Sequence, residues 1–164
     1  MVVPIVVPMS RRYEYRRTLP HYQGNRQAIF ATFATHHRWH LPEIARDLVV
    51  EACLHLHETR CTLHGFVVMP DHVHLVFTPL ADDCGPVSLP EILQKVKSES
   101  AHWINKLLGR KGRVWQDESF DHVLRRAEGI GAKLEYIRSN PVRAGLVKEP
   151  GAYKWMWFEV LAQG

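Results

Sequence analysis

Two histidines, a tyrosine and an asparagine are the residues of this chain whose types and spacing could do chemistry. His72 and His74 stand two residues apart in an apolar, β-branched run, which we interpret as the second arm of a hairpin over residues 61–79 that turns at residues 69–71. Side chains alternate along a strand, so both imidazoles lie on one face, about 7 Å apart along the strand. At that spacing both rings can bind one metal ion.

A helix predicted just before Pro141 carries the other two residues. Proline disfavours the helical conformation in the residue before it, so this helix is predicted to end near Asn140. Tyr136 and Asn140 are four residues apart and are therefore neighbours on one helical face. A phenol that can act as a nucleophile and an amide oxygen that can bind a metal then point the same way. Together with the two histidines, they form a set suited to metal-assisted phosphodiester transfer.

Each of these motifs also has a purely structural interpretation. A His-x-His in a strand is often a pair of partly exposed polar side chains, and Tyr136 could be a surface phenol that packs on the sheet. His36, His37 and His40 lack a regular ligand spacing, and we interpret them as surface histidines. The three cysteines have no Cys-x-x-Cys spacing, so they indicate neither a disulfide framework nor a thiolate zinc site.

Three segments relate these residues to a known family. Residues 67–75, 114–123 and 135–147 resemble, in order and spacing, the motifs of the REP-associated tyrosine transposases, a branch of the single-tyrosine HUH transposases. The resemblance extends from about Arg11 over nearly the whole remaining chain. It implies an α+β fold, a ferredoxin-like or RRM-like sandwich. In that fold the HUH motif lies on a central strand of an antiparallel sheet, and the catalytic tyrosine lies on a C-terminal helix.

The resemblance also implies an activity. It implies a DNA transposase that cleaves single-stranded DNA at palindromic hairpins and transfers the strand, with Tyr136 as the nucleophile that forms a covalent 5′-phosphotyrosine. A divalent metal, Mg²⁺ or Mn²⁺, would be held by His72, His74 and Asn140, and two histidines would also bind Zn²⁺, Ni²⁺ or Co²⁺. Other HUH transposases have a glutamine at the position of Asn140. The implied protein is a monomer or homodimer, cytoplasmic and nucleoid-associated in bacteria.

The order of the predicted elements agrees with that fold. Strand, helix, strand, strand, helix and strand follow one another as in a ferredoxin-like sandwich. They are predicted over residues 27–35, 41–57, the two arms of 61–79, about 89–108, and 114–123. A third helix, which carries Tyr136, then remains to cover the open face of the sheet.

Apolar spacing predicts which side chains are buried. The residues that alternate with the two histidines form the core face of the hairpin. Three-and-four spacing places Ile44 on the buried stripe of the first helix. We expect the last strand of the sandwich to pack through Trp115, Phe120 and Val123. The aromatic residues of 153–158 are expected to cover the core.

Charge and length suggest the partner and the organisation. The 164 residues carry a formal net charge of +4 with a pI near 9.1, which favours an anionic partner. We predict a flexible tail over residues 1–10 and one transposase domain over 11–164. The apolar start is too short and too proline-rich for a membrane helix, so no membrane partner is expected. The residues predicted to contact DNA are His122 and two basic clusters, Arg11, Arg12, Arg16, Arg17 and Lys106, Arg110, Lys111, Arg113.

Two other classes of protein fit the same pattern. A ferredoxin-like domain can bind nucleic acid without catalysis, through aromatic residues on its strands. A histidine-bound metal can activate water, which would make the protein a hydrolase rather than a transesterase. A domesticated transposase that binds DNA but has lost mobility is a third alternative.

Overall fold

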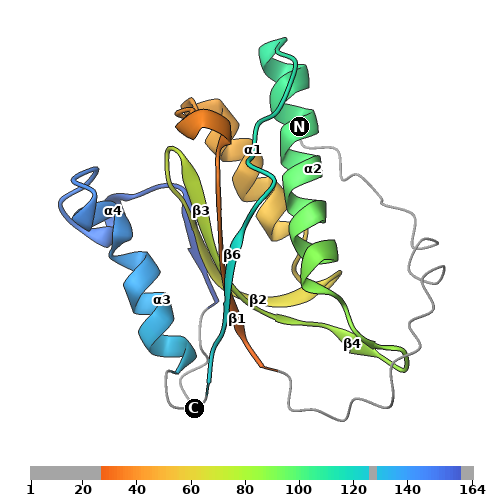
Figure 1. Ribbon diagram of the computed structural model, residues 1–164. Coiled ribbons are helices and arrows are strands. Elements are labelled where there is room, and N and C mark those ends of the chain that lie inside the picture. The colour runs from red at the N-terminus through yellow and green to blue at the C-terminus, as the bar shows by residue number, and fades with distance from the viewer. Residues whose placement is uncertain (1–26, 126–128, 160–164) are drawn as a thin grey trace.

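The sheet of the protein has the strand order of a ferredoxin-like sandwich (Figure 1). The computed structural model describes residues 27–125 and 129–159. The sheet order is β6-β1-β3-β2-β7, and each neighbouring pair is antiparallel. The sandwich consists of β1 (Ile29–Ala34), α1 (Glu43–Leu54), β2 (Cys61–Val68), β3 (His72–Pro79), α2 (Leu89–Leu108) and β6 (Phe120–Val123). The predicted α+β architecture is therefore confirmed.

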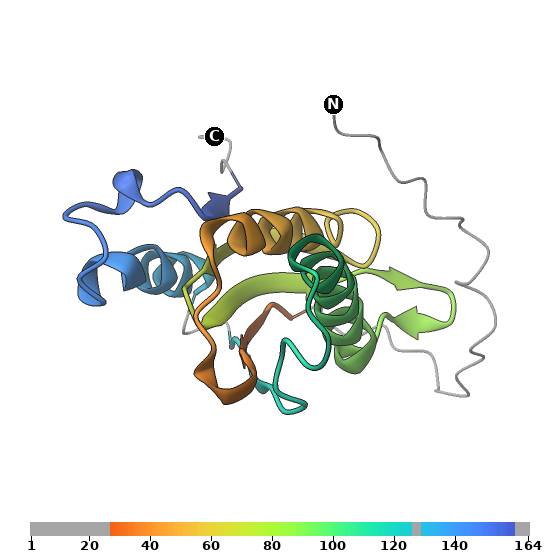
Figure 2. The same cartoon turned by 90° about the horizontal axis from the view of Figure 1, so that it is seen from above.

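The C-terminal part of the chain covers the other face and extends one edge of the sheet. α3 (Ile130–Arg138) packs on β2 and β3, and β7 (Met156–Phe158) pairs with β2. Figures 1 and 2 show α1 and α2 on one side of the sheet and α3 on the other. The remaining short elements are η2 (His36–Arg38), β4 (Ala81–Asp82), β5 (Gly85–Pro86), α4 (Asn140–Arg143) and η3 (Pro150–Ala152).

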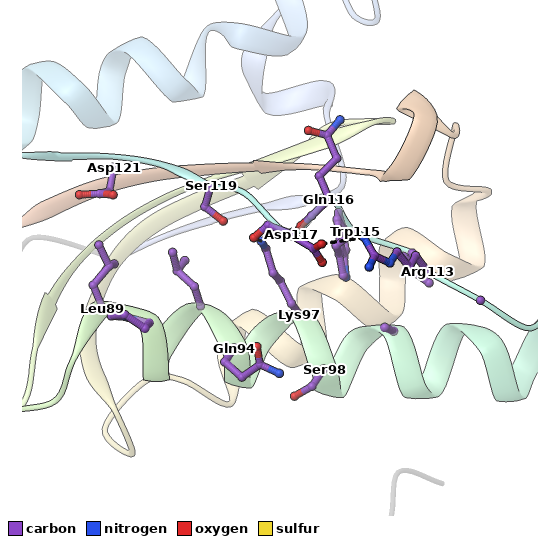
Figure 3. Close-up of a pocket in the computed structure, with 15 residues that line it drawn as sticks. Leu89, Gln94, Lys97, Ser98, Arg113, Trp115, Gln116, Asp117, Ser119 and Asp121 are labelled. Atoms are coloured by element: carbon purple, nitrogen blue, oxygen red, sulfur yellow. Dashed lines mark hydrogen bonds and ion pairs between the residues drawn. The ribbon is translucent and has the colours of Figure 1, made fainter.

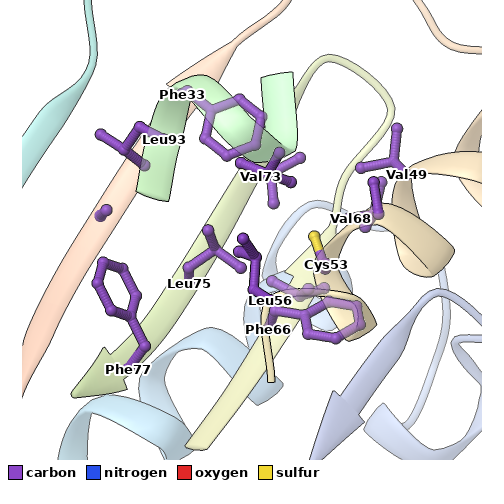
Figure 4. Packing of buried hydrophobic residues seen from close by; sticks show 14 of the residues in the cluster. Phe33, Val49, Cys53, Leu56, Phe66, Val68, Val73, Leu75, Phe77 and Leu93 are labelled. Carbon is purple, nitrogen blue, oxygen red and sulfur yellow. The ribbon is translucent and has the colours of Figure 1, made fainter. Parts of the chain in front are cut away.

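The main apolar core lies between the sheet and the pair α1 and α2 (Figure 4). Val73, Leu75 and Phe77 of β3 are fully buried there, against side chains such as Val49 of α1 and Leu93 of α2. Because strand side chains alternate, the two histidines of β3 must face the opposite way, toward α3. The packing of one face therefore fixes the direction of the functional groups on the other.

The two predicted helices of this layer are confirmed. Ser88 begins α2 by accepting a hydrogen bond from the backbone N–H of Glu91 (3.2 Å), and Gly109 ends it in the left-handed conformation with φ +61°. The prediction that Ile44 is buried was wrong: Ile44 is exposed, and Ala45 is buried in the core instead. Among the helices of the described residues, none combines the length and the apolar character that crossing a bilayer requires.

The strand predicted over residues 114–123 is shorter than expected. Trp115 packs as predicted, because its ring lies edge-on to Phe33 at 4.8 Å and its Nε1 donates to Ser100 Oγ (2.9 Å). Phe120 and Val123, which were also expected to pack, are both exposed, although the Phe120 ring lies edge-on to Phe30 at 6.4 Å. β6 lies at the edge of the sheet, while α3 packs over β2 and β3, so the described elements cover little of either face of β6.

The aromatic C-terminal segment covers the core as predicted. Tyr153 and Trp155 are buried, and the Tyr153 hydroxyl donates to the Val68 carbonyl (2.6 Å). Burial raises the pKa of Tyr153, against the lowering effect of the nearby Arg46. These contacts attach the chain that follows α3 and α4 to the start of the β2–β3 turn.

Candidate functional site

His72 and His74 lie side by side on the face of β3 that α3 covers. Their ring centroids are 4.7 Å apart, with the ring planes at 76° to each other. His74 is only 9% exposed, whereas His72, nearer the β2–β3 turn, is partly open to solvent. The predicted placement of the two imidazoles on one strand face is therefore observed.

A neighbouring side chain holds each imidazole by its Nδ1 atom. His72 Nδ1 donates to Asp71 Oδ1 (2.7 Å), and a hydrogen bond of 2.7 Å joins His74 Nδ1 to Thr32 Oγ1. With the proton on Nδ1, the lone pair of each ring is on Nε2, where it can bind a metal. This arrangement, in which a second group orients a ligating histidine, is the usual one in protein metal sites.

The surroundings of the two histidines set the protonation states of His74 and Asp71. Burial, together with the nearby charges of His72, Arg143 and Lys133, lowers the pKa of His74 to about 3, so the ring is neutral at pH 7. Burial alone would raise the pKa of Asp71, but the hydrogen bond and charge of His72 outweigh it, and the net pKa is lowered. A neutral His74 and an ionised Asp71 are the protonation states that a metal site needs.

Tyr136 reaches the same face from α3. Its ring centroid is 6.5 Å from that of His74, and its side chain is 46% exposed. The helix can lie this close because β2 has a glycine beneath it. A Cβ at Gly65 would be 2.8 Å from Leu134 Cδ2 of α3 and 2.6 Å from Phe158 Cδ1 of β7. The sequence therefore brings a phenol beside the buried imidazole.

The chain around Asn140 differs from the prediction. α3 ends at Arg138 as expected, but helical geometry resumes at once, and Asn140 begins α4 instead of ending the helix. Pro141 is tolerated because it lies in the first turn of α4, where no intrahelical N–H bond is required of it. Asn140 Oδ1 accepts a hydrogen bond from Arg143 (3.3 Å). Its metal-binding role stays a prediction.

The donor set fits a divalent ion with two protein nitrogens and further oxygen ligands. Within residues 27–125 and 129–159, no three His, Cys, Asp or Glu side chains gather as a metal-binding group. A third ligand would therefore be an oxygen of another kind, such as the amide of Asn140 or an oxygen of the DNA. Imidazole with neutral oxygen ligands suits Mn²⁺, and a site with open positions suits a reacting complex.

Two cations beside Tyr136 were not predicted from the sequence. Lys133 Nζ lies 5.1 Å from the centroid of the Tyr136 ring, and Arg143 Cζ lies 4.2 Å from it. The Arg143 guanidinium also donates to the Tyr136 carbonyl (3.0 Å), and this hydrogen bond holds the Arg143 side chain against α3. Positions three before and seven after the tyrosine share its helical face, and this spacing was the available signal.

The predicted DNA contacts fall into three groups. Arg11, Arg12, Arg16 and Arg17 lie outside the described residues. Lys106, Arg110, Lys111 and Arg113 lie at the end of α2 and in the turn after it, where Arg110 stacks on Trp39 (4.0 Å) and Arg113 forms an ion pair with Asp117 (2.7 Å). His122 lies on β6 opposite Phe30, on the α3 face. His37 and His40 are exposed as expected, and His36 is half-buried.

A groove of about 540 Å³ lies on the other side of the sheet, between α2 and residues 112–121 (Figure 3). Lys97 stands in it and donates to the backbone carbonyls of Gln116 (2.9 Å), Asp117 (3.2 Å) and Glu118 (3.3 Å). Burial lowers the pKa of Lys97, against the charge of Asp117. The lysine fixes the turn that leads into β6, so we interpret this groove as structural.

Comparison with known proteins relates this site to a family. A sequence model of the family described as "Transposase IS200 like" matches residues 24–140, a range that includes both histidines, the tyrosine and Asn140. The REP-associated tyrosine transposase of Escherichia coli (strain K12) is 27% identical over 97 residues, 58% of this chain and 53% of that protein. The match thus spans about half the length of this curated relative.

Two solved structures are similar in fold. A REP-associated tyrosine transposase bound to a REP hairpin matches with a TM-score of 0.64 and 24% identity, over 87% of this chain and 81% of that chain. A putative transposase from Deinococcus radiodurans R1 matches with a TM-score of 0.48 and 16% identity, over 75% of this chain and 97% of the other.

Proposed function

The chain belongs to the family of IS200-like transposases, and on that premise we propose that it cleaves and rejoins single-stranded DNA at hairpins, as a DNA transposase of the REP-associated type. The observation that carries the proposal is the approach of Tyr136 and His74, whose rings are 6.5 Å apart although they come from α3 and β3. A phosphate between the phenol and the imidazole pair would meet a nucleophile on one side and metal ligands on the other.

Tyr136 is the proposed nucleophile. Its phenol oxygen attacks a phosphorus of the DNA backbone and forms a P–O bond while the bond to the 3′ oxygen breaks. The phenol loses its proton and the leaving oxygen gains one, so the cleaved strand ends in a 3′-hydroxyl and the 5′ side stays on the tyrosine. One phosphodiester replaces another, and the reverse reaction with a second 3′-hydroxyl joins a new strand without an external energy source.

The histidines are the proposed metal ligands. His72 and His74, with Asn140 or a DNA oxygen as a further ligand, would hold Mg²⁺ or Mn²⁺ at their Nε2 atoms, and Zn²⁺, Ni²⁺ or Co²⁺ would bind the same pair. When bound, the ion would polarise the scissile phosphate and offset the charge that develops on its oxygens. Asp71 and Thr32 orient the two rings for this task.

Lys133 and Arg143 are proposed to bind the scissile phosphate. Both cations lie against the Tyr136 ring, so a phosphate within reach of the phenol is also within reach of them. A guanidinium binds phosphate oxygens in a fixed, bidentate geometry, while an ammonium acts as a point charge. The pair would align the phosphorus with the phenol oxygen and reduce the charge repulsion that the incoming DNA would otherwise meet.

The DNA hairpin is proposed to lie over the basic turn that follows α2 and the α3 face. Lys106, Lys111 and the stacked Arg110 provide positive charge there, and His122 lies on the adjoining edge strand. A related fold solved with a REP hairpin supports a hairpin as the partner. We expect a monomer or homodimer, in the cytoplasm of bacteria and associated with the nucleoid.

The test uses labelled hairpin oligonucleotides with single-stranded flanks, copied from any palindromic repeats found near the gene, and incubates them with the protein and Mn²⁺. We expect a covalent adduct that survives denaturation and that mass spectrometry assigns to Tyr136, with no adduct from Tyr136→Phe. Circular dichroism checks that the variant is folded. Cleavage without an adduct would favour a metal hydrolase, and tight binding without cleavage would favour a non-catalytic or domesticated binding protein.

A further inference from the structure

Phe120 exposes its ring on the same sheet face as the candidate site. It is 61% exposed, the largest exposed fraction among the large apolar side chains that the structure describes. In the sheet register Phe120 lies opposite Thr32, and Thr32 lies opposite His74. Residues that are paired across an antiparallel sheet share a face, so Phe120, Thr32 and His74 form one row across three strands.

Aromatic rings connect Phe120 to the nucleophile. Phe30 lies between them, with its ring centroid 6.4 Å from that of Phe120 and 6.4 Å from that of Tyr136, both edge-on. Phe30 also stacks on His74 at 5.4 Å and is itself buried. Phe120 is thus the solvent-exposed end of an aromatic row that leads to Tyr136, and its position is fixed relative to the reacting groups.

β6, the edge strand that carries Phe120, is fixed by strand pairing and by hydrogen bonds to the turn before it. All four residues of β6 pair with β1, and the turn before it is fixed by the three hydrogen bonds that Lys97 donates to residues 116–118. A ring on such a support loses little conformational freedom when a flat ligand binds it. Beside the Phe30 ring, this face also carries a polar and a cationic group, His122 on β6 and Lys133 over Phe30 at 4.6 Å.

We propose that Phe120 is a base-stacking residue, on which the base of a nucleotide next to the scissile phosphate stacks. This rests on the proposed function, because Tyr136 marks the position of that phosphate. An exposed ring on the same face as Lys133 and His122 matches a nucleotide, which has a flat base and an anionic backbone, better than it matches an apolar protein surface. Stacking tolerates any base, so Phe120 would position the strand without reading its sequence.

The test measures DNA binding in the Tyr136→Phe background, where no cleavage can occur. The labelled oligonucleotides are a DNA hairpin with a single-stranded thymidine flank and the same hairpin with abasic residues in the flank. We expect Phe120→Ala to weaken binding of the thymidine flank by about 5- to 150-fold, equivalent to roughly 1–3 kcal/mol, and to leave binding of the abasic flank unchanged.

Three further variants separate stacking from structure. Phe120→Trp should restore the affinity, whereas Phe120→Leu, which keeps the apolar bulk without a flat ring, should not. Val123→Ala, an exposed apolar change on the other face of the same strand, should have no effect. An equal loss of affinity for both flanks, or no loss for either, would overturn the proposal.

The outcome is distinguishable from failure of the proposed function. If the wild-type protein forms no phosphotyrosine but Phe120→Ala still weakens binding of the thymidine flank selectively, stacking stands and transesterification fails. If the wild-type protein forms the adduct and Phe120→Ala binds both flanks normally, stacking alone fails. If the protein binds neither hairpin, both proposals are wrong.

Discussion

The two faces of the sheet are covered in different ways. On one face, α1 and α2, with 12 and 20 residues, bury an apolar core. On the other, the nine residues of α3 cover part of the sheet and leave Tyr136 and Phe120 exposed beside a polar row. Leu75 and His74 are adjacent in β3, yet the first packs in the core and the second hydrogen-bonds with Thr32.

This difference suggests a division of roles. Burial of apolar surface is the main favourable contribution to folding, and most of it lies on the side of α1 and α2. The α3 face can therefore keep a buried imidazole, an exposed phenol and nearby cations, which do not maximise stability. The five predictions below test whether function and stability separate between the faces.

The largest effect is expected at Tyr136. Tyr136→Phe removes the proposed nucleophile but keeps the ring contacts with Phe30 and His74, so cleavage should fall by at least about a thousandfold. Its thermal midpoint should stay within a few degrees of the wild type, because the hydroxyl belongs to a partly exposed side chain. Oligonucleotide cleavage and calorimetry measure the two quantities. If Tyr136→Phe cleaves normally, Tyr136 is not the nucleophile and the α3 face loses its proposed functional role.

The next effect is on the opposite face. Leu75→Ala leaves a cavity in the core and should lower the free energy of unfolding by about 2–5 kcal/mol, as measured by urea denaturation. Cleavage per folded molecule should be unchanged. The control is Leu107→Ala on the exposed side of α2, which should change stability by less than about 0.5 kcal/mol. A large loss of activity in folded Leu75→Ala would show that the two faces are coupled.

Asp71 should affect metal binding more than stability. Asp71→Asn keeps the shape of the side chain but removes the charge that orients His72, so Mn²⁺ should bind about 10- to 100-fold more weakly. Isothermal titration calorimetry measures the affinity. Asp83→Asn, in the exposed β4–β5 turn, is the control and should bind Mn²⁺ as the wild type does. Equal affinity in both variants would mean that Asp71 does not position the ligand.

Gly65 tests how closely α3 must lie on the sheet. The added methyl group of Gly65→Ala would clash with Leu134 and Phe158, which should cost about 1–3 kcal/mol of unfolding free energy and displace α3. Cleavage should then fall as well, because α3 carries Tyr136. The matched control is Gly131→Ala, where nothing lies within 4 Å and a better helix former should be neutral or stabilising. If Gly65→Ala is destabilised but cleaves DNA as fast as the wild type, the close packing of α3 on the sheet is not required for cleavage.

The last prediction concerns pH, where the change within any one pH unit is small. His74 has a pKa of about 3 in the folded protein, against 6.5 for an ordinary histidine. Between these values the unfolded chain binds a proton that the folded protein does not, so stability rises with pH and is lost as the pH falls from 6.5 toward 3. The contribution is at most about 1.4 kcal/mol per pH unit.

Urea titrations of the metal-free protein, with a chelator present, measure this slope. His74→Gln has no imidazole to protonate, so its free energy of unfolding should depend less on pH over this range. Parallel slopes in the two proteins would show that His74 is not held in a neutral state by burial.

The sequence predicted the elements because their signals are local. Alternation indicated β3 and the direction of both histidines, and Ser88 and Gly109 marked the ends of α2. Helical spacing then placed Tyr136 and Asn140 on one face of the same helical segment. These conclusions need only the neighbours of each residue along the chain.

The features that were missed depend on distant parts of the chain. Thr32 supports His74 only through the register of β1 against β3, and Arg143 meets Tyr136 only because helical geometry continues past Pro141. Phe120 was expected to pack, but it is exposed because β6 is an edge strand. Alternation along a strand does not reveal whether that strand lies at the edge of its sheet. The residues that surround Tyr136 and the two histidines were therefore harder to predict than the placement of these three residues.

The hydrogen bonds from Asp71 and Thr32 have a consequence for the life of the protein in a cell. The two imidazoles have their supporting partners within the fold itself, so under the proposed function both rings are oriented before an ion binds. Scarcity of manganese or magnesium would then leave the amount of intact protein unchanged and silence its chemistry. If the proposed metal dependence holds, a shortage of the ion would act as a reversible brake on DNA breakage, and renewed supply would release it without new protein synthesis.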